Sequence, residues 1–242
     1  MNHIIAIANQ KGGVAKTTTA VNLSASLAAM DQRVLLVDLD PQANATVGSG
    51  IDVSKLKKSS YHLLLGKSTL SDTLMPTLEA GYDIIPTTGD LIAADVELTT
   101  MMVGREQKLN QALQPIHRLY DYIIIDCPPA LNMLTLNAMV AAKSVLIPMQ
   151  CEYYAMEGLS SLLKTIEDIR TSVNPGLAIE GLLLTMYDPR NNLANEVSAQ
   201  LTNHFGKKVY QTAIPRNVRL AEAPSYGVPV LMYDPNSRGA LA

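Results

Sequence analysis

NQKGGVAKTTT, residues 9–19, decides the fold class of this 242-residue chain. The stretch follows the apolar run HIIAIA at 3–8 and leads into a helical pattern over 16–30. A loop that joins a buried strand to a helix, with glycines ahead of a Lys-Thr pair, is the setting of a phosphate-binding loop. In such a loop Lys16 neutralises the β- and γ-phosphates of a nucleotide.

The same stretch departs from the general pattern G-x-x-x-x-G-K-S/T, which requires glycine six residues and one residue before its lysine. These two positions hold Gln10 and Ala15, and the two glycines present are Gly12 and Gly13. A second lysine, Lys11, precedes them. A methyl group at position 15 is tolerated where the backbone is close to helical, but it is strained at a positive φ. We expect nucleotide to bind, because the backbone amides of the loop remain available.

The hydroxyl groups that follow the lysine predict further nucleotide contacts. Thr17 is placed to hold Mg²⁺ through its hydroxyl, and Thr18 lies towards the α-phosphate side. The N-terminus of the following helix adds a partial positive charge. The residues expected to bind nucleotide here are Gly12, Gly13, Val14, Ala15, Lys16, Thr17 and Thr18. A glycine-rich turn that caps an ordinary helix is the alternative.

Two later apolar runs end in aspartates. VLLVDLDPQAN presents Asp38 and Asp40 on one side of an extended backbone, and YIIID ends in Asp126. Ligands of parallel sheets bind at the carboxyl ends of the strands, so these acids are expected beside the phosphate loop. The predicted metal ligands are Thr17, Asp40 and Asp126, with Asp126 holding Mg²⁺ through its water shell. For Asp38, a role in turn contacts is an open alternative.

Apolar runs and helical patterns alternate along the whole chain. Most runs are apolar on both faces, which is typical of strands buried between two layers. Strands are expected at 3–8, 33–38, 82–86, 120–126, 143–149, 180–187 and 208–215. Helices are expected at 16–30, 104–118, 131–142, 156–172 and 192–205, and an insertion of small helices at 48–79. This order predicts an α/β fold, with a mostly parallel central sheet, helices on both faces and a single domain over 1–242.

Composition narrows the classes of function. Hydrophobic residues make up 48% of the chain, and the net charge of −3 excludes a protein that coats nucleic acid through overall basicity. Cys127 and Cys151 form no C-x-x-C pair, so neither a disulfide framework nor a metal–thiolate site is indicated. No run approaches the roughly 18 apolar residues of a membrane span, and no signal peptide is visible. We expect a cytoplasmic protein.

With these motifs, the chain resembles the ParA/Soj-type chromosome and plasmid partitioning ATPases. They belong to the deviant Walker-A group of P-loop proteins, which includes MinD and nitrogenase iron protein. The matching stretches are KGGVAKTT at 11–18, VLLVDLDPQAN at 34–44, YIIIDCPP at 122–129, QCEYYAMEGL at 150–159, TMYDPR at 185–190 and IPRNVRLAEAPSYG at 214–227. The resemblance implies a Mg²⁺-dependent ATPase that binds ATP and ADP and has weak activity until a partner stimulates it.

The resemblance also implies catalytic roles for single residues. Lys11 matches the signature lysine, which reaches across a nucleotide-sandwich homodimer to the phosphates bound by the other subunit. Asp40 matches the hydrolytic aspartate, which orients or activates the attacking water. Asp126 matches the Walker-B acid, and Lys16 and Thr17 match the phosphate and Mg²⁺ ligands.

The adenine pocket of such proteins lies beside the loop that matches IPRN. Pro215 and Asn217 are therefore candidates for the base pocket, together with Met186. One departure concerns Ala15, because the family usually has glycine before the Walker lysine. This difference bears on the rate of hydrolysis.

Partitioning ATPases of this type bind double-stranded DNA without sequence preference once ATP has formed the dimer, and they act with a ParB/Spo0J-type partner. A local cationic surface is required, since the chain as a whole is acidic. The candidates for DNA binding are Arg190, Lys207, Lys208, Arg216 and Arg219. Each alone is more often a solvated surface charge. The resemblance thus implies a nucleoid-associated protein that does not use a membrane.

Several alternatives remain. A MinD-like positioning ATPase needs a C-terminal amphipathic helix, whereas this sequence ends YDPNSRGALA; one more helix usually follows, so we expect the C-terminal helix to be truncated. A nucleotide-gated binding switch with little hydrolysis is open because of Ala15. An iron-protein reductase is disfavoured because Cys127 has no suitably spaced partner. A repressor with an N-terminal helix-turn-helix has no room before residue 11.

Overall fold

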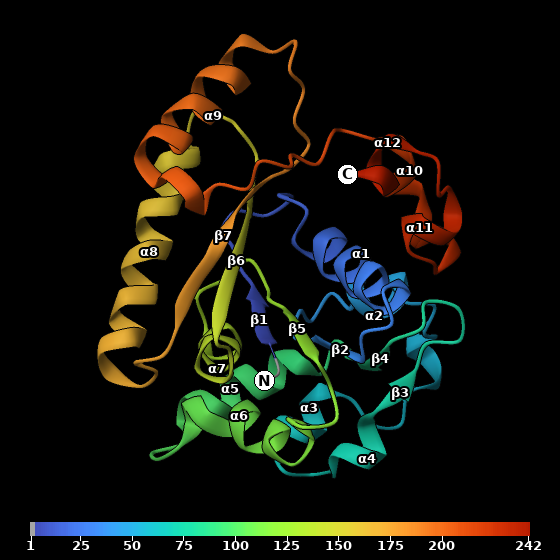
Figure 1. The fold of residues 1–242 in the computed structure, drawn as a ribbon. Helices are drawn as coiled ribbons and strands as arrows, with labels where there is room; N and C mark the ends of the chain where they lie inside the picture. The colour runs from blue at the N-terminus through green and yellow to red at the C-terminus, as the bar shows by residue number, and fades with distance from the viewer. Residues whose placement is uncertain (1–2) are drawn as a thin grey trace.

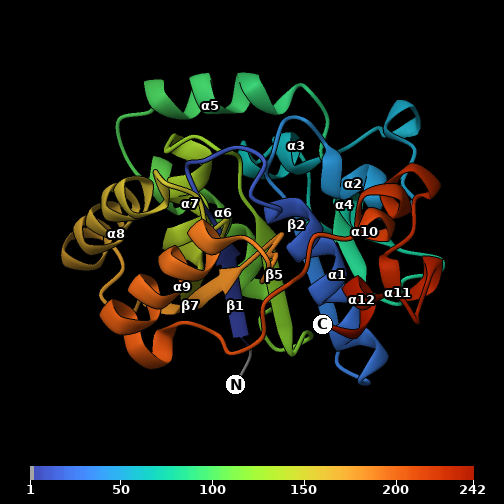
Figure 2. The ribbon, with the colours of Figure 1, turned by 90° about the horizontal axis from the view of Figure 1, so that it is seen from above.

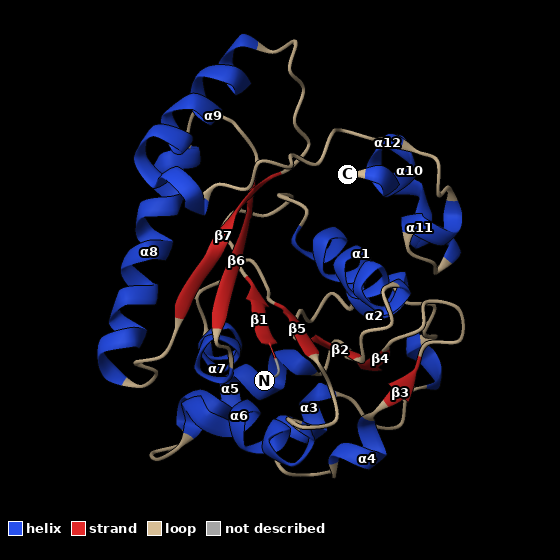
Figure 3. Ribbon diagram, viewed as in Figure 1, coloured by secondary structure: helices blue, strands red, loops and turns tan. Residues whose placement is uncertain are grey.

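The structure, a computed structural model, describes residues 3–242 and is built around a seven-stranded sheet (Figure 1, Figure 3). The strand order is β3-β4-β2-β5-β1-β6-β7, and only β3 runs antiparallel to its neighbour. The strands are β1 (His3–Ile7), β2 (Val34–Asp38), β3 (Met75–Pro76), β4 (Asp83–Ile85), β5 (Tyr122–Asp126), β6 (Ser144–Met149) and β7 (Ala178–Leu184). The expected mostly parallel α/β sheet is confirmed.

Helices connect the strands and cover the sheet. They are α1 (Lys16–Ala29), α2 (Asn44–Gly48), α3 (Ser60–Leu64), α4 (Leu70–Thr73), α5 (Leu91–Thr100), α6 (Lys108–Leu113), α7 (Met133–Ala141), α8 (Ala155–Ser172), α9 (Asn192–Phe205), α10 (Val218–Glu222), α11 (Val230–Tyr233) and α12 (Arg238–Leu241). Short 3₁₀ turns are η1 (Val53–Lys55), η2 (Arg105–Gln107), η3 (Gln114–Ile116), η4 (Gly206–Lys208) and η5 (Ala223–Tyr226). Within residues 3–242, no helix has both the length and the apolar character needed to cross a lipid bilayer.

Both faces of the sheet are buried because alternate residues of a strand enter different cores. In β1, Ile4 and Ala6 belong to one hydrophobic cluster, and Ile5 and Ile7 belong to the other. Helices α3 and α5 to α9 pack on the first cluster, and α1 and α2 pack on the second. Figure 1 shows these helices on the two sides of the sheet, and Figure 2 shows α10 to α12 beside α1. Strands apolar on both faces are therefore explained by two covering layers.

The expected strand at 208–215 does not form. This segment makes only two isolated bridges, from Val209 to Leu182 in β7 and from Pro215 to Tyr187, which lies after β7. Near its start, the ring of Tyr210 packs so closely on β7 that a Cβ at Gly181 would lie 2.5 Å from a ring carbon. The segment contacts β7 here by side-chain packing and not by a continuous set of backbone hydrogen bonds, so it does not form an eighth strand of the sheet.

The expected helix at 104–118 is also wrong in detail. It is divided into η2, α6 and η3, and Pro115 in the last of these has no amide to donate to a continuous helix. Helix α5 and the two-residue strand β3 were not expected from the sequence. The insertion at 48–79 does contain short helices, α3 and α4 among them, as expected.

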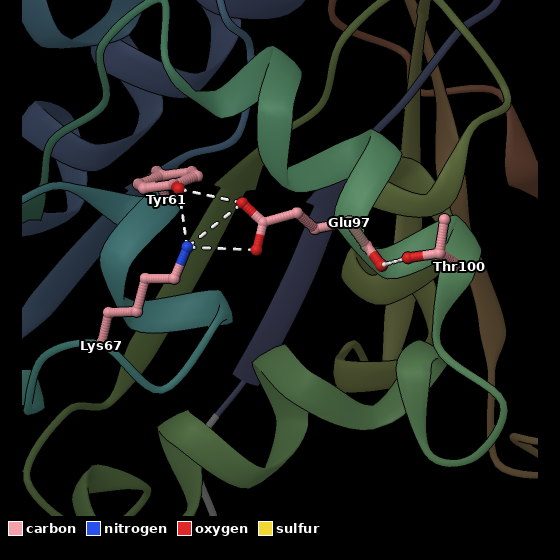
Figure 4. A network of polar contacts seen from close by, with 4 residues as sticks. All are labelled: Tyr61, Lys67, Glu97 and Thr100. Carbon is pink, nitrogen blue, oxygen red and sulfur yellow. Dashed lines mark hydrogen bonds and ion pairs between the residues drawn. The ribbon is translucent and has the colours of Figure 1, made fainter.

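A polar network ties α3 to α5 at a distance in sequence from the phosphate loop (Figure 4). Tyr61 Oη donates to Glu97 Oε1 over 3.0 Å, and Lys67 Nζ donates to Tyr61 Oη over 2.7 Å and to both Glu97 oxygens over 3.1 Å. Thr100 caps the same turn by donating to the Glu97 carbonyl over 2.7 Å. Exposed ion pairs contribute at most about 1 kcal/mol, so this network positions the two helices more than it stabilises the fold.

Candidate nucleotide site

The phosphate-loop stretch lies at the carboxyl end of β1, in the middle of the sheet between β5 and β6. Two side chains outside the KGGVAKTT segment at 11–18 hold it there. Asn9 Nδ2 donates to the Pro148 carbonyl over 2.8 Å, and Asn9 Oδ1 accepts from the Lys11 amide over 3.0 Å. Thr185 Oγ1, just after β7, donates to the Val14 carbonyl over 3.0 Å. Sequence reasoning missed both; the amide side chain of Asn9 directly after an apolar run was the available signal.

Ala15 has the left-handed backbone conformation, with φ 66° and ψ 32°, as it precedes α1. The near-helical backbone that would tolerate its methyl group is therefore absent. An L-residue in this region carries strain of about 1–2 kcal/mol. Thr19 secures the turn, because its amide and its hydroxyl both donate to the Ala15 carbonyl, over 2.9 and 2.7 Å. Gly13 also has a positive φ, 74°, at no comparable cost.

Lys16 is buried under the loop, with 7% of its surface exposed. Its Nζ donates to the Lys11 carbonyl over 3.0 Å. Burial lowers the pKa of Lys16, while the charges of Asp126 and Asp40 act in the opposite direction. A lysine held in the curl of backbone amides, at the start of a helix, is placed to receive an anion.

Asp126, the last residue of β5, pairs in register with Asp38, the last residue of β2, and is fully buried. Its Oδ2 accepts a 2.7 Å bond from Thr17 Oγ1, whereas its Oδ1 has no partner among residues 3–242. Burial, and then the charge of Asp38, raises the pKa of Asp126 well above its usual range. An orphaned buried carboxylate oxygen beside a threonine hydroxyl fits a hydrated divalent cation.

The described part of the chain, 3–242, contains no group of three or more acidic, histidine or cysteine side chains that could by itself hold a metal ion. A cation beside Thr17 and Asp126 therefore requires oxygen ligands from elsewhere. Nucleotide phosphates and water supply such ligands to Mg²⁺, which keeps several waters in its shell. The residues fit a metal that arrives together with a nucleotide.

Asp38 and Asp40 have different surroundings although two residues apart. The Asp38 carboxylate accepts from the Asp40 amide over 3.0 Å, and from the Thr46 amide and hydroxyl over 2.8 and 2.7 Å. These bonds fit the alternative that Asp38 makes turn contacts. Burial raises the pKa of Asp38 to about 6, and the bonds from Thr46 oppose this change. Asp40 Oδ1 accepts from the Gln42 amide over 3.0 Å, and its Oδ2 makes no hydrogen bond within residues 3–242.

Lys11 lies on the open side of the loop. Its Nζ forms an ion pair with Glu152, which follows β6, and both side chains are about half exposed. Such a pair contributes at most about 1 kcal/mol, so it can exchange for a stronger anionic partner. The Lys11 side chain is therefore accessible to a neighbouring molecule.

A cavity of about 600 Å³ adjoins the loop and collects all the residues expected at the base. Ala15 and Thr18 line it from the phosphate side, and Met186, Pro215 and Asn217 line it from the segments after β7. Asn217 Oδ1 also accepts from the Arg219 amide over 2.8 Å at the start of α10. The lining is mostly apolar, as expected for a pocket that takes an aromatic base. Additional lining residues not expected from the sequence include Asn22, Leu23, Leu183 and Tyr210.

The five cationic DNA candidates do not form one cluster. Arg190 precedes α9 and Lys207 follows it, so the two are separated by a 14-residue helix, about 21 Å long. Lys208 Nζ donates to the Ile179 carbonyl over 2.6 Å, which holds it against β7. Arg216 is exposed and also borders the cavity.

Two of these cations are already neutralised within the chain. Arg190 makes two hydrogen bonds of 2.9 and 2.8 Å to Asp188, and Arg219 pairs with Glu222 over 2.8 Å and with Asp234 over 3.2 Å. Within residues 3–242, neither Lys207 nor Arg216 makes an ion pair. The structure therefore separates the candidates into paired and unpaired charges.

Fold and site together define a P-loop nucleotide-binding protein whose loop departs from the general pattern. A family described as AAA domain matches residues 2–179. The chain is 52% identical over 240 residues to the sporulation initiation inhibitor protein Soj of Bacillus subtilis, covering 99% of this chain and 94% of that protein. The chain belongs to the ParA/Soj family of chromosome-partitioning ATPases.

Solved structures agree with the fold. Cobyrinic acid a,c-diamide synthase from Mycobacterium smegmatis, with bound ADP and magnesium, is 39% identical, has a TM-score of 0.85, and matches over 94% of this chain and 93% of its own. The septum site-determining protein MinD from Pyrococcus horikoshii, complexed with Mg-ADP, is 28% identical, with a TM-score of 0.80 and coverage of 100% and 93%. Both neighbours hold magnesium and ADP in this fold.

Proposed function

We propose that the chain is a Mg²⁺-dependent ATPase that dimerises with ATP, binds DNA without sequence preference and segregates chromosomes or plasmids with a ParB-type partner. The observation that carries the proposal is the arrangement of Thr17, Asp126 and Lys16, with an unpartnered carboxylate oxygen beside a hydroxyl and a buried ammonium. Magnesium and ADP in two neighbours of the same fold support ATP and ADP as ligands, and Mg²⁺ as cofactor.

The phosphate loop would hold the nucleotide through its backbone. The amides from Gly12 to Thr18 surround the phosphates, and Lys16 exchanges its bond to the Lys11 carbonyl for a phosphate oxygen. Thr17, Asp126 and Asp40 would hold the hydrated Mg²⁺, which neutralises charge on the phosphates. The base would enter the cavity between Met186 and the segment that carries Pro215 and Asn217.

Hydrolysis requires a group that orients water, and Asp40 is our candidate. One of its oxygens is engaged by the Gln42 amide, which fixes the carboxylate, while the other is left to accept from water. Asp38 would act through Asp40, because it bonds the Asp40 amide and anchors α2 through Thr46. We assign Lys11 to the nucleotide of a second subunit, where its charge would stabilise the transferring phosphoryl group.

DNA binding would depend on the dimer, which doubles the number of cations on one assembly. Arg190, Lys207, Lys208, Arg216 and Arg219 are the proposed contacts. They would act by releasing counterions from phosphates, which makes binding sensitive to salt and indifferent to sequence. We further propose that the chain works as one domain, in the cytoplasm and on the nucleoid.

Light scattering coupled to size exclusion tests the proposal. The protein is run with Mg·ADP and with Mg·ATP, each with and without DNA of random sequence. We expect a monomer with ADP, a dimer with ATP, and co-elution with DNA only with ATP. Co-elution that is equal with ADP and ATP would contradict the nucleotide-dependent cycle.

A second candidate is a nucleotide-gated switch that binds DNA and a partner but hydrolyses ATP very slowly. The left-handed Ala15 favours it, since a strained loop is less able to adjust during the reaction. Turnover measured with DNA and a ParB-type partner, compared with Asp40→Ala, separates the two. Equal rates for wild type and Asp40→Ala would support the switch. The diamide synthase reaction is less favoured, because sequence identity is 39% to that enzyme and 52% to Soj.

A further inference from the structure

Two residues that line the cavity, Ala15 and Met186, have left-handed backbone conformations, with φ 66° and 50°. They lie on segments 171 residues apart in sequence from Val14 to Thr185. Only a few positions of the described chain other than glycine have a positive φ. Non-glycine residues persist in this conformation when their surroundings over-determine it.

Thr185 is the side chain that joins the two segments. It is buried, with 1% of its surface exposed, and its Oγ1 donates to the carbonyl of Val14, which is itself 1% exposed. Its own amide donates to the Met149 carbonyl over 2.9 Å, so the threonine is fixed to the sheet through β6. Through Thr185, the carbonyl of Val14, the residue immediately before Ala15, is therefore anchored to the sheet.

We propose that Thr185 is a positioning residue that holds the phosphate loop in shape because residue 15 is alanine. By fixing the Val14 carbonyl, the Thr185 hydroxyl prevents the Val14–Ala15 peptide from rotating out of its left-handed arrangement. The amides between Gly13 and Lys16 then stay directed at the phosphate site. This inference rests on the proposed function only in taking the loop to bind nucleotide phosphates.

The contrary view is that Thr185 merely satisfies a buried carbonyl and stabilises the core. That role predicts lower stability without a selective effect on the loop. It also predicts the same loss whichever residue stands at position 15. A glycine at position 15 distinguishes the two views, because glycine adopts this backbone without strain and has less need of the brace.

The test uses four variants of the full chain: Thr185→Val, which keeps the shape and removes the hydroxyl; Thr185→Ser, which keeps the hydroxyl; Ala15→Gly; and Thr185→Val with Ala15→Gly. Affinity for Mg·ADP is measured by calorimetry, and amide hydrogen exchange of residues 11–18 is measured without nucleotide. We expect Thr185→Val to weaken Mg·ADP binding about tenfold and to speed exchange in the loop, and Thr185→Ser to stay within about twofold of wild type. In the Ala15→Gly background, Thr185→Val should weaken Mg·ADP binding by about threefold or less.

An equal loss in both backgrounds, or unchanged exchange in Thr185→Val, would overturn the proposal. If Thr185→Val does not fold, Thr185→Ala takes its place, and the comparison between backgrounds is unchanged. A wild-type protein that binds no Mg·ADP would refute the proposed function, whereas the exchange measurement still decides whether Thr185 braces the loop. Wild-type binding with no difference among the variants would refute only the inference about Thr185.

Discussion

The phosphate loop and the cationic segments proposed to bind DNA, which carry Arg190, Lys207, Lys208, Arg216 and Arg219, differ in how their side chains are held. In the loop, Lys16 is buried and Thr17 bonds Asp126 across a sequence separation of 109 residues. In the cationic set, Arg190 keeps 88% of its side chain exposed and pairs with Asp188, two residues away. Long-range buried bonds fix a geometry, while local exposed pairs leave it adjustable. A fixed geometry is what the proposed hydrolysis needs, and an adjustable one is what the proposed binding of DNA without sequence preference needs.

The largest effect is expected from Asp40→Asn, which tests whether the site is built for chemistry. Asparagine keeps the size of the side chain but is a poor base, so turnover with partner and DNA should fall about 10³-fold. Binding of Mg·ATP should change less than about threefold, because the phosphate contacts remain and the amide oxygen of asparagine can still accept from a water bound to Mg²⁺. Turnover is measured by phosphate release, and binding by calorimetry.

Asp38→Asn is the matched control for this prediction. It also removes one carboxylate charge, but Asp38 is engaged by three donors and does not face water. It should lower stability as well as turnover, whereas Asp40→Asn should leave the melting temperature nearly unchanged. If Asp40→Asn left turnover intact, the assignment of Asp40 to water would be wrong.

Lys16→Met should weaken Mg·ADP binding by about 100-fold, the next largest effect. Loss of a charged hydrogen-bond donor costs about 1.5–3 kcal/mol, and methionine fills the same volume without the charge. Lys11→Met is the control, since Lys11 is exposed and is expected to act on another subunit. It should leave Mg·ADP binding of the monomer within about twofold and impair ATP-dependent dimerisation. Equal losses for both lysines would contradict the separation of their roles.

The placement of the phosphate loop and the strand-end acids at one edge of the sheet was predictable, because each depends on a local pattern in a strand–loop–helix context. Gly12, Lys16 and Asp126 needed no knowledge of distant neighbours. The bond from Thr185 to the Val14 carbonyl was not predictable, because only the folded sheet brings the two within 3.0 Å. The 208–215 segment was wrongly expected as a strand because its apolar pattern does not reveal that Tyr210 packs on Gly181. The ion pairs of Arg190 and Arg219 were likewise not visible in the sequence, which does not show which acidic side chains lie beside them.

The C-terminal part of the chain is also closely packed where Gly227 meets the turn that follows α2. Gly227 has φ +68°, and a Cβ there would lie 2.9 Å from the Gly50 Cα. Gly227→Ala should lower the free energy of unfolding by about 3 kcal/mol, from strain and from the backbone clash. Gly66→Ala is the matched control, since its φ is +67° with no atom within 4 Å of the added Cβ. It should lower the free energy of unfolding in urea by only about 1 kcal/mol, and equal losses would show that the turn at Gly50 moves aside freely.

The smallest effects are expected for the residues proposed to bind DNA. Among them, we expect a residue without an ion pair to contribute more to DNA affinity than a paired one. Arg216 and Lys207 make no ion pair within residues 3–242, so their full charge is available to phosphates, whereas Arg219 is compensated by Glu222 and Asp234. Arg216→Ala should reduce ATP-dependent DNA affinity about fivefold and lower the slope of log K against log salt by about 0.9. Arg219→Ala should have about half that effect on the slope.

Arg170→Ala supplies the control for these cations, because Arg170 is an exposed arginine on α8 paired with Glu167 and lies outside the proposed set. Fluorescence anisotropy with labelled duplex, from low to high salt and with Mg·ATP throughout, gives both affinity and slope. An effect of Arg170→Ala equal to that of Arg216→Ala would mean that general charge, and not this surface, attracts DNA. If Arg219→Ala reduced the DNA affinity more than Arg216→Ala, the ion pairs of Arg219 with Glu222 and Asp234 would have to open when DNA binds. DNA binding would then change the conformation of the cationic segments.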